Sequence, residues 1–127
     1  MMVVYASKTG NVERFMSKLP VRKMKITNEL FMHEPFVLVT YTTGFGQVPT
    51  EVQSFLERND RYLRGVAASG NQNWGTSYGK AGDTIAAQYQ VPIVHKFELS
   101  GTKQDAEKFL LGVEQIEQSC FQMDRAQ

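Results

Sequence analysis

Cysteine is almost absent from this chain, with Cys120 the only one among 127 residues. A single thiol excludes an internal disulfide framework and any metal or redox site built on a Cys-x-x-Cys pair. No run approaches the roughly 18 consecutive apolar residues that a bilayer span requires. The apolar start Met1–Tyr5 is too short for a signal peptide and has no basic residue before it. The sequence therefore predicts a cytoplasmic protein with no membrane partner.

An excess of charge of one sign is also lacking. The chain has 14 Lys and Arg against 13 Asp and Glu, a formal net charge of +1, so no overall field favours nucleic acid. The two histidines, His33 and His95, have no other metal-ligating residues in a suitable spacing, and no metal site is expected. Repeats, low-complexity tracts and linkers are missing as well. We expect one domain over residues 1–127.

The apolar pattern that is present changes between the strand period and the helix period along the chain. Five strands and four helices in strict alternation predict an α/β fold, a parallel sheet with helices on both faces. Thr102 and Asp105 resemble a capping box at the start of the last helix. The expected strands are 1–5, 23–27, 36–39, 65–68 and 92–98, and the expected helices are 11–19, 50–58, 81–89 and 102 onward.

The loop after the first strand has the composition of a phosphate-binding turn. In such a fold, ligands lie beyond the carboxyl ends of the strands. At this turn, backbone N–H groups, hydroxyls and the start of a helix can surround an anion, although an ordinary turn with a helix cap has a similar composition. The residues are Ser7, Lys8, Thr9, Gly10 and Asn11.

Two later loops favour a ligand over an ordinary turn. Thr42–Pro49 contains Phe45 between two glycines, and Ser69–Gly79 contains Trp74 and Tyr78 among amides and glycines. Neither loop has an acidic residue. Phe45 could instead anchor the following helix, and Trp74 could pack under its own loop. Taken together, the three loops predict a site for a phosphorylated flat heterocycle, which needs stacking surfaces and in-plane hydrogen bonds.

Other phosphate-handling classes on similar folds are excluded at specific positions. A phospho-acceptor receiver domain needs an Asp at the end of the third strand, where Val39, Thr40 and Tyr41 stand. The Gly-x-x-x-x-Gly-Lys-Ser/Thr motif of P-loop nucleotidases is absent. Gly44 and Gly46 do not follow the first strand, and Pro49 occupies the place of a third glycine, so the dinucleotide fingerprint is not met.

Four phrases in order resemble the NrdI family of small, flavodoxin-like FMN proteins. They are Ser-Lys-Thr-Gly-Asn at 7–11, Thr-Tyr-Thr-Thr-Gly-Phe-Gly at 40–46, Gly-Asn-Gln-Asn-Trp-Gly at 70–75 and Phe-Glu-Leu-Ser-Gly-Thr at 97–102. The resemblance covers roughly residues 1–118. It implies a flavodoxin-like, doubly wound five-stranded parallel sheet of order 2-1-3-4-5, which periodicity alone does not establish.

The resemblance also implies a role beside the manganese-type (class Ib) ribonucleotide reductase. Reduced FMN passes an electron to O2, and the superoxide reaches the dimanganese centre of the reductase small subunit, where it helps to generate the tyrosyl radical. A flavin reductase or another electron donor, which the sequence does not identify, would reduce the FMN. The alternatives are a general flavodoxin that shuttles electrons, and an adaptor that has lost its flavin.

The site residues that the resemblance implies fall into three groups. Ser7, Lys8, Thr9, Gly10 and Asn11 hold the phosphate; Thr42, Thr43, Gly44 and Phe45 border one side of the flavin; Asn71, Asn73, Trp74 and Gly75 border another, with Tyr78 nearby. No side chain is expected to be catalytic, because the cofactor carries the chemistry. The loop at Gly44 and Phe45 is expected to respond to the redox state of the flavin.

Overall fold

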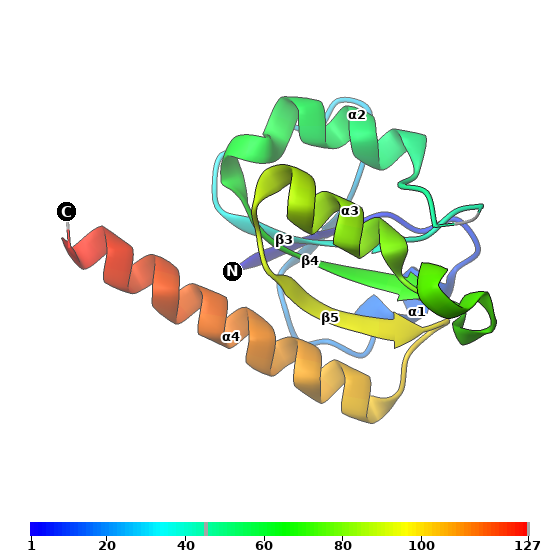
Figure 1. The fold of residues 1–127 in the computed structure, drawn as a ribbon. Coiled ribbons are helices and arrows are strands. Elements are labelled where there is room, and N and C mark those ends of the chain that lie inside the picture. Colours follow the sequence, from blue (N-terminus) through cyan, green and yellow to red (C-terminus); the bar gives the residue numbers. More distant parts are fainter. Residues whose placement is uncertain (45, 127) are drawn as a thin grey trace.

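The computed structural model describes residues 1–44 and 46–126, apart from the side chains of residues 74, 76 and 121–126. A parallel sheet of five strands runs through the molecule (Figure 1) in the order β2-β1-β3-β4-β5. The predicted flavodoxin-like order is therefore confirmed. The strands are β1 (Met2–Tyr5), β2 (Lys23–Lys25), β3 (Phe36–Tyr41), β4 (Leu63–Gly70) and β5 (Ile93–Glu98).

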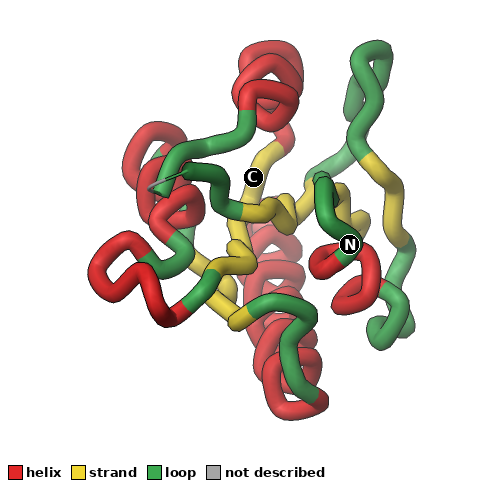
Figure 2. The backbone as a smooth tube through the Cα atoms, turned by 90° about the vertical axis from the view of Figure 1, so that its right-hand side faces the viewer, coloured by secondary structure: helices red, strands yellow, loops and turns green. Residues whose placement is uncertain are grey.

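Helices cover both faces of the sheet, as predicted (Figure 1, Figure 2). The α2 and α3 helices pack on one face, and α1 and α4 pack on the other. Within the described residues, no helix has the length and apolar character needed to cross a membrane. The helices are α1 (Asn11–Met16), α2 (Thr50–Asn59), α3 (Lys80–Tyr89) and α4 (Lys103–Ala126), with short 3-10 helices η1 (Asp60–Tyr62) and η2 (Gln72–Ser77).

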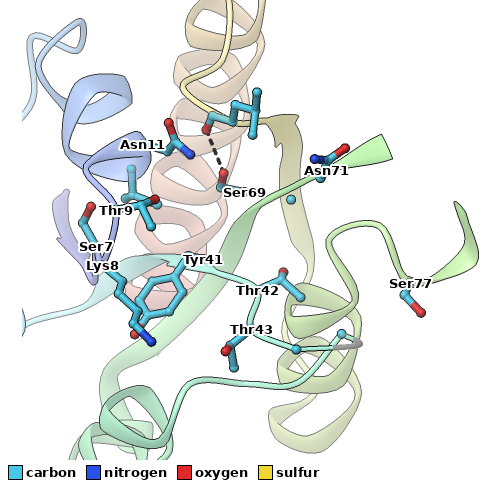
Figure 3. Close-up of a pocket in the computed structure, with 15 residues that line it drawn as sticks. Ser7, Lys8, Thr9, Asn11, Tyr41, Thr42, Thr43, Ser69, Asn71 and Ser77 are labelled. Atoms are coloured by element: carbon cyan, nitrogen blue, oxygen red, sulfur yellow. Dashed lines mark hydrogen bonds between the residues drawn. The ribbon is translucent and has the colours of Figure 1, made fainter. Parts of the chain in front are cut away.

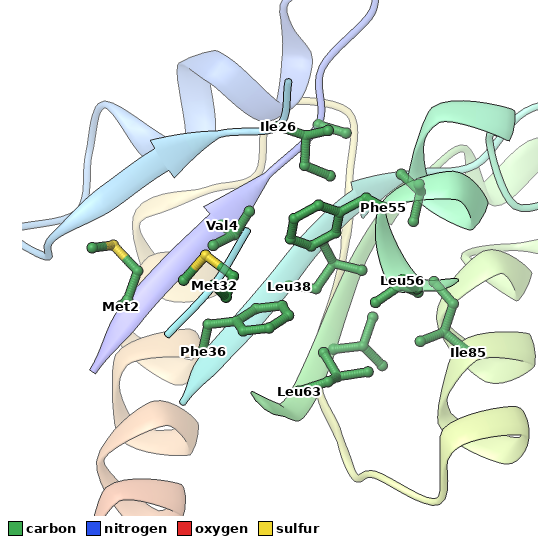
Figure 4. Packing of buried hydrophobic residues seen from close by; sticks show 13 residues of the cluster. Met2, Val4, Ile26, Met32, Phe36, Leu38, Phe55, Leu56, Leu63 and Ile85 are labelled. Carbon is green, nitrogen blue, oxygen red and sulfur yellow. The ribbon is translucent and has the colours of Figure 1, made fainter. Parts of the chain in front are cut away.

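The central strand β3 is buried on both faces, which explains its continuous apolar run. Phe36 and Leu38 face α2, where Phe36 meets Phe55 edge to face with ring centroids 5.6 Å apart (Figure 4). Val37 and Val39 belong to the cluster beneath α1 and α4. Each fully buried side chain of this size stabilises the fold by about 1.5–3 kcal/mol. The strand therefore positions the loop that follows it firmly at the carboxyl edge of the sheet.

The first helix is shorter than the predicted 11–19, and that boundary was wrong. After Met16 the backbone N–H groups of Lys18 and Leu19 bond to carbonyls three residues back, which tightens the chain out of the α-helix. The Lys23 ammonium donates hydrogen bonds to the carbonyls of Met16 and Leu19, at 2.7 and 2.9 Å. A cation that bonds to carbonyls at the end of a helix stabilises this early end.

Strands and helices do not alternate strictly, because no helix connects β2 to β3. The expected bounds also place no helix between residues 27 and 36, and that part of the prediction is confirmed. Residues 26–35 cross as a loop, and β2 ends at Lys25, before the predicted Thr27. The amide of Asn59, at the end of α2, accepts a bond from the Met32 N–H (2.7 Å) and donates to the Leu30 carbonyl (3.1 Å). The buried Asn59 side chain thus supplies hydrogen-bond partners for backbone groups of this loop, which in a helix would bond to one another.

The other predicted elements lie within a few residues of their expected bounds. The fourth strand is longer than the predicted 65–68, because parallel pairing with β3 and β5 continues to its end. The capping box is confirmed: the Asp105 N–H bonds to Thr102 Oγ1 (3.1 Å), and the Thr102 N–H bonds to the Asp105 carboxylate (2.8 Å). The last helix extends well beyond the sheet (Figure 1).

Candidate functional site

A pocket of about 350 Å³ opens at the carboxyl edge of the sheet (Figure 3). Figure 2 looks at this edge of the sheet end on. The pocket lies among the loops that follow β1, β3, β4 and β5, near the point between β1 and β3 where the 2-1-3-4-5 strand order reverses. Its described lining consists of Ser7, Lys8, Thr9, Asn11, Val12, Tyr41, Thr42, Thr43, Gly44, Gly46, Ser69, Gly70, Asn71, Ser77 and Leu99.

Eight of the 14 predicted site residues meet in this pocket. Those that line it are Ser7, Lys8, Thr9, Asn11, Thr42, Thr43, Gly44 and Asn71. Phe45 and the side chain of Trp74 lie outside the described residues. The structure thus brings together three segments that are far apart in the sequence.

Gly10, Asn73, Gly75 and Tyr78 are not among the lining residues, but three of them shape the loops. Gly10 is the residue directly before α1 and has φ 90°, a left-handed conformation that favours glycine. The Asn73 N–H bonds to Asn71 Oδ1 (2.9 Å), which fixes the Asn71 amide. Gly75 has φ 58° with no atom within 4 Å of an added Cβ, so only its backbone angle requires glycine.

Several lining residues escaped the sequence analysis. Tyr41, Ser69 and Gly70 end their strands, and the rule that ligands lie at carboxyl ends could have included them. Leu99 lies in the phrase at 97–102, to which no role was given. Gly46 and Ser77 lie in the two loops that the sequence analysis singled out but were not named as site residues, and Val12 carried no signal that separated it from an ordinary helix residue.

The loop after β3 is a tight turn closed by backbone hydrogen bonds. The Thr43 N–H bonds to the Gln47 carbonyl (3.0 Å), and the Gln47 N–H returns to the Thr43 carbonyl (2.7 Å). Gly44 has φ 54°, and an added Cβ would lie 2.8 Å from Gln47 Oε1. Glycine is therefore favoured here by its backbone angle, while the Gln47 side chain would have to move to admit a Cβ.

Thr42 carries a buried polar atom with nothing to bond to. Its Oγ1 is closed off from solvent and has no hydrogen-bond partner among the described residues, while the residue itself lines the pocket. A buried unsatisfied hydroxyl costs about 1–3 kcal/mol. Such a group fits a site where a ligand atom supplies the missing partner.

The described pocket lining contains no acidic side chain, but the fold brings two carboxylates close to its rim. Glu98 of β5 accepts a bond from the Gln72 N–H of η2, 2.9 Å away. Glu51 of α2 accepts a bond from the Tyr41 hydroxyl, 2.8 Å away. Burial, and next the bond to Glu51 and its charge, raise the pKa of Tyr41 to about 12. Sequence alone did not reveal these neighbours, because neither lies in the two loops.

Proteins similar in sequence match nearly the whole chain. A family model described as NrdI flavodoxin-like matches residues 3–110. Protein NrdI of Bacillus licheniformis is 55% identical over 115 residues, 90% of this chain and 88% of that protein. The SPbeta prophage-derived protein NrdI of Bacillus subtilis is 44% identical over 129 aligned positions, 98% of this chain and 100% of that protein.

Solved structures of flavodoxins share the fold at low sequence identity. A short-chain flavodoxin associated with a non-canonical PDU bacterial microcompartment superposes with a TM-score of 0.70 at 20% identity, over 93% of this chain and 96% of that one. A mutant flavodoxin from Pseudomonas aeruginosa gives a TM-score of 0.59 at 16% identity, over 92% and 97%. These two structures support the architecture alone.

Proposed function

Because the chain belongs to the NrdI flavodoxin-like family, we propose that its pocket binds FMN and that it activates class Ib ribonucleotide reductase. The pocket's position supports FMN, since a phosphate turn and two loops with polar edges converge there. The unpartnered Thr42 hydroxyl fits a polar edge of the ring system. In this proposal residues 1–127 form one flavodoxin-like domain that works in the cytoplasm.

Each part of the pocket has its own task in this proposal. Ser7, Lys8, Thr9, Gly10 and Asn11 hold the phosphate, and Lys8 offsets part of its charge. Since α1 has only six residues, side chains and loop N–H groups contribute more to this than the helix dipole does. The flavin is bordered by Thr42, Thr43, Gly44 and Phe45 on one side and by Asn71, Asn73, Trp74, Gly75 and Tyr78 on the other.

Bound FMN, once reduced by a separate electron donor, would supply the electron that converts O2 to superoxide, the oxidant for assembly of the dimanganese–tyrosyl radical cofactor in the reductase small subunit. One observation carries this choice: the described pocket lining has no carboxylate. Like-charge repulsion from nearby carboxylates would disfavour the fully reduced, anionic flavin. A lining without acids leaves that state accessible for reaction with O2.

A general electron shuttle is the second candidate, and a specific observation supports it. Glu51 and Glu98 border the site through their bonds to Tyr41 and the Gln72 N–H. Their charges at the rim would disfavour the second electron in the same way. The two functions differ in whether these charges act on the flavin strongly enough to disfavour its second reduction. Measuring both one-electron potentials of the bound flavin distinguishes them.

The deciding experiment combines the protein, FMN, a chemical reductant, O2 and the manganese-loaded small subunit. Tyrosyl radical, measured by electron paramagnetic resonance, should form only with all components, and superoxide dismutase should suppress it if superoxide diffuses before capture. A protein that binds FMN and reduces cytochrome c but yields no radical is an electron shuttle. A protein that retains no FMN is an adaptor on this scaffold.

A further inference from the structure

The turn Leu99–Gly101 after β5 is held firmly against the pocket, although the proposed function gives it no task. The Leu99 N–H bonds to the Gly70 carbonyl (3.0 Å), and the Ser69 hydroxyl donates to the Leu99 carbonyl (2.7 Å). These bonds hold Leu99 at φ 53°, a backbone angle that is unfavourable for residues other than glycine. The Lys18 ammonium adds bonds to the carbonyls of Ser100 and Gly101. Ser100 is therefore fixed in place.

Ser100 completes a closed ring of hydrogen bonds with Asn11 and Arg14. Arg14 Nε donates to Ser100 Oγ (3.0 Å), Ser100 Oγ donates to Asn11 Oδ1 (3.0 Å), and Arg14 Nη2 donates to the same Oδ1 (2.6 Å). A guanidinium can only donate, so the Asn11 atom that faces it must be the carbonyl oxygen. The donors that surround it therefore fix the orientation of the Asn11 amide.

Arg14 reaches this position because Gly10 leaves room for it. An added Cβ on Gly10 would lie 2.9 Å from Arg14 Nη1, so the absent side chain lets the guanidinium lie beneath the phosphate turn. Gly10 thus contributes to the site through Arg14 as well as through its own backbone angle of φ 90°. The guanidinium also adds a positive charge next to that turn.

The ring leaves the Asn11 NH2 group as the only part of the amide available to a ligand. Asn11 lines the pocket, and Figure 3 shows its nitrogen on the pocket side and its oxygen turned away. Among the described residues, this nitrogen has no hydrogen-bond partner. Two N–H donors facing a pocket favour an anion with several acceptor oxygens, such as a phosphate monoester.

We propose that Arg14 and Ser100 are positioning residues that hold Asn11 as an obligatory donor to the phosphate of FMN. The inference rests on the proposed function, because it presumes that the pocket takes a flavin phosphate. It assigns a role to two residues outside the phosphate turn, one on α1 and one after β5. It also explains why the turn at 99–101 is anchored so firmly to the end of β4 and to α1.

The test compares FMN with riboflavin, which lacks the phosphate, by fluorescence titration of the full-length protein. Asn11→Asp preserves both acceptor contacts to Arg14 and Ser100 but presents a carboxylate oxygen to the ligand. It should weaken FMN binding by about 30-fold and leave riboflavin binding within about twofold. Its thermal stability without flavin should be equal to or above that of the parent, because Arg14 then faces a carboxylate. If the role of Asn11 were purely structural, a variant that keeps its thermal stability would also keep its FMN affinity.

Two further variants test the positioning residues. Ser100→Ala removes one member of the ring and should weaken FMN binding about fivefold, and Ser100→Thr, which keeps the hydroxyl, should restore it. Arg14→Lys keeps the charge but loses the planar guanidinium, two nitrogens of which donate to Ser100 and Asn11, so it should resemble Ser100→Ala. Ser17→Ala is the matched control, since its hydroxyl bonds to the Arg14 carbonyl away from the pocket (2.7 Å). It should leave FMN binding unchanged.

The outcomes separate this inference from the proposed function. If the parent protein prefers FMN to riboflavin but Asn11→Asp and Ser100→Ala bind FMN as the parent does, the inference is wrong and FMN binding stands. Equal losses for FMN and riboflavin in these variants would also overturn the inference, because the effect would not involve the phosphate. If the parent binds neither flavin, both proposals fail.

Discussion

His95 Nε2 of β5 lies 2.7 Å from Asp105 Oδ1 in the first turn of α4. The same carboxylate accepts bonds from the N–H and the hydroxyl of Thr102. One side chain therefore caps α4 and ties that helix to the edge strand of the sheet. This connection lies directly after the turn 99–101, which borders the pocket.

The Asp105 carboxylate should make stability depend on pH in the acid range. Burial acts to raise its pKa, but the bonds from His95 and Thr102 outweigh burial and lower it. An acid with a lowered folded pKa stabilises the fold above its unfolded pKa, about 3.9, and loses that contribution as pH falls through the folded value. Asp105→Asn should therefore cost about 1 kcal/mol at pH 7 and much less near pH 3.

Urea unfolding at both pH values measures this difference. Glu107→Gln is the control, because Glu107 is an exposed acid on the same helix. It should change stability by no more than about 0.5 kcal/mol at either pH. An Asp105→Asn penalty that stays constant from pH 7 to pH 3 would show that the charge contributes nothing.

Thr42→Val should stabilise the protein without flavin and weaken FMN binding. Removing the unpartnered buried hydroxyl should raise the free energy of unfolding by about 1 kcal/mol, and losing its bond to the ligand should weaken FMN about tenfold. Thr40→Val is the matched control, since Thr40 is fully buried and its hydroxyl donates to the Tyr41 carbonyl (2.9 Å). That variant should destabilise the protein. Thermal melts and flavin titration measure both effects, and a destabilised Thr42→Val would contradict this view of the pocket.

Asn71→Asp should make the second one-electron potential of bound FMN more negative. The new carboxylate keeps its bond from the Asn73 N–H but places a negative charge among described lining residues that include no acid. Repulsion of the anionic, fully reduced flavin should lower that potential by about 50 mV. Anaerobic titration with a redox dye measures the shift, and Gln90→Glu, at the far end of α3, is the charge-matched control. Equal potentials in both variants would mean that the pocket's lack of acid does not tune the flavin.

Asn59→Ala should destabilise the whole domain. Its amide is 2% exposed and bonds to the Met32 N–H and to the carbonyls of Leu30 and Phe55. Truncation leaves several buried backbone groups without partners, at a cost of about 3 kcal/mol. Gln53→Ala removes an exposed amide bond on the same helix and should cost no more than about 0.5 kcal/mol. Urea unfolding compares the two, and similar small losses would show that the 26–35 loop is held by other contacts.

The sequence alone was sufficient for the fold class and for most of the pocket. Strand β3 and helices α2 and α4 bury so many apolar residues at regular spacing that periodicity located them. The segments 7–11, 42–44 and 69–71 lie at or directly after strand ends, and parallel strands direct such segments to one edge of the sheet. The strand order came from the family resemblance, since local pattern carries no information on which strands are neighbours.

Tertiary structure decided the rest, because the responsible contacts join residues that are distant in the sequence. Lys23 binds the carbonyl of Met16 at the early end of α1, and Asn59 holds the backbone of the loop that crosses to β3. Neither shows in the local apolar pattern. The orientation of Asn11 depends on Ser100, which lies 89 positions away. A side chain's type can be taken from the sequence, but the direction in which an amide faces depends on the donors that folding brings to it.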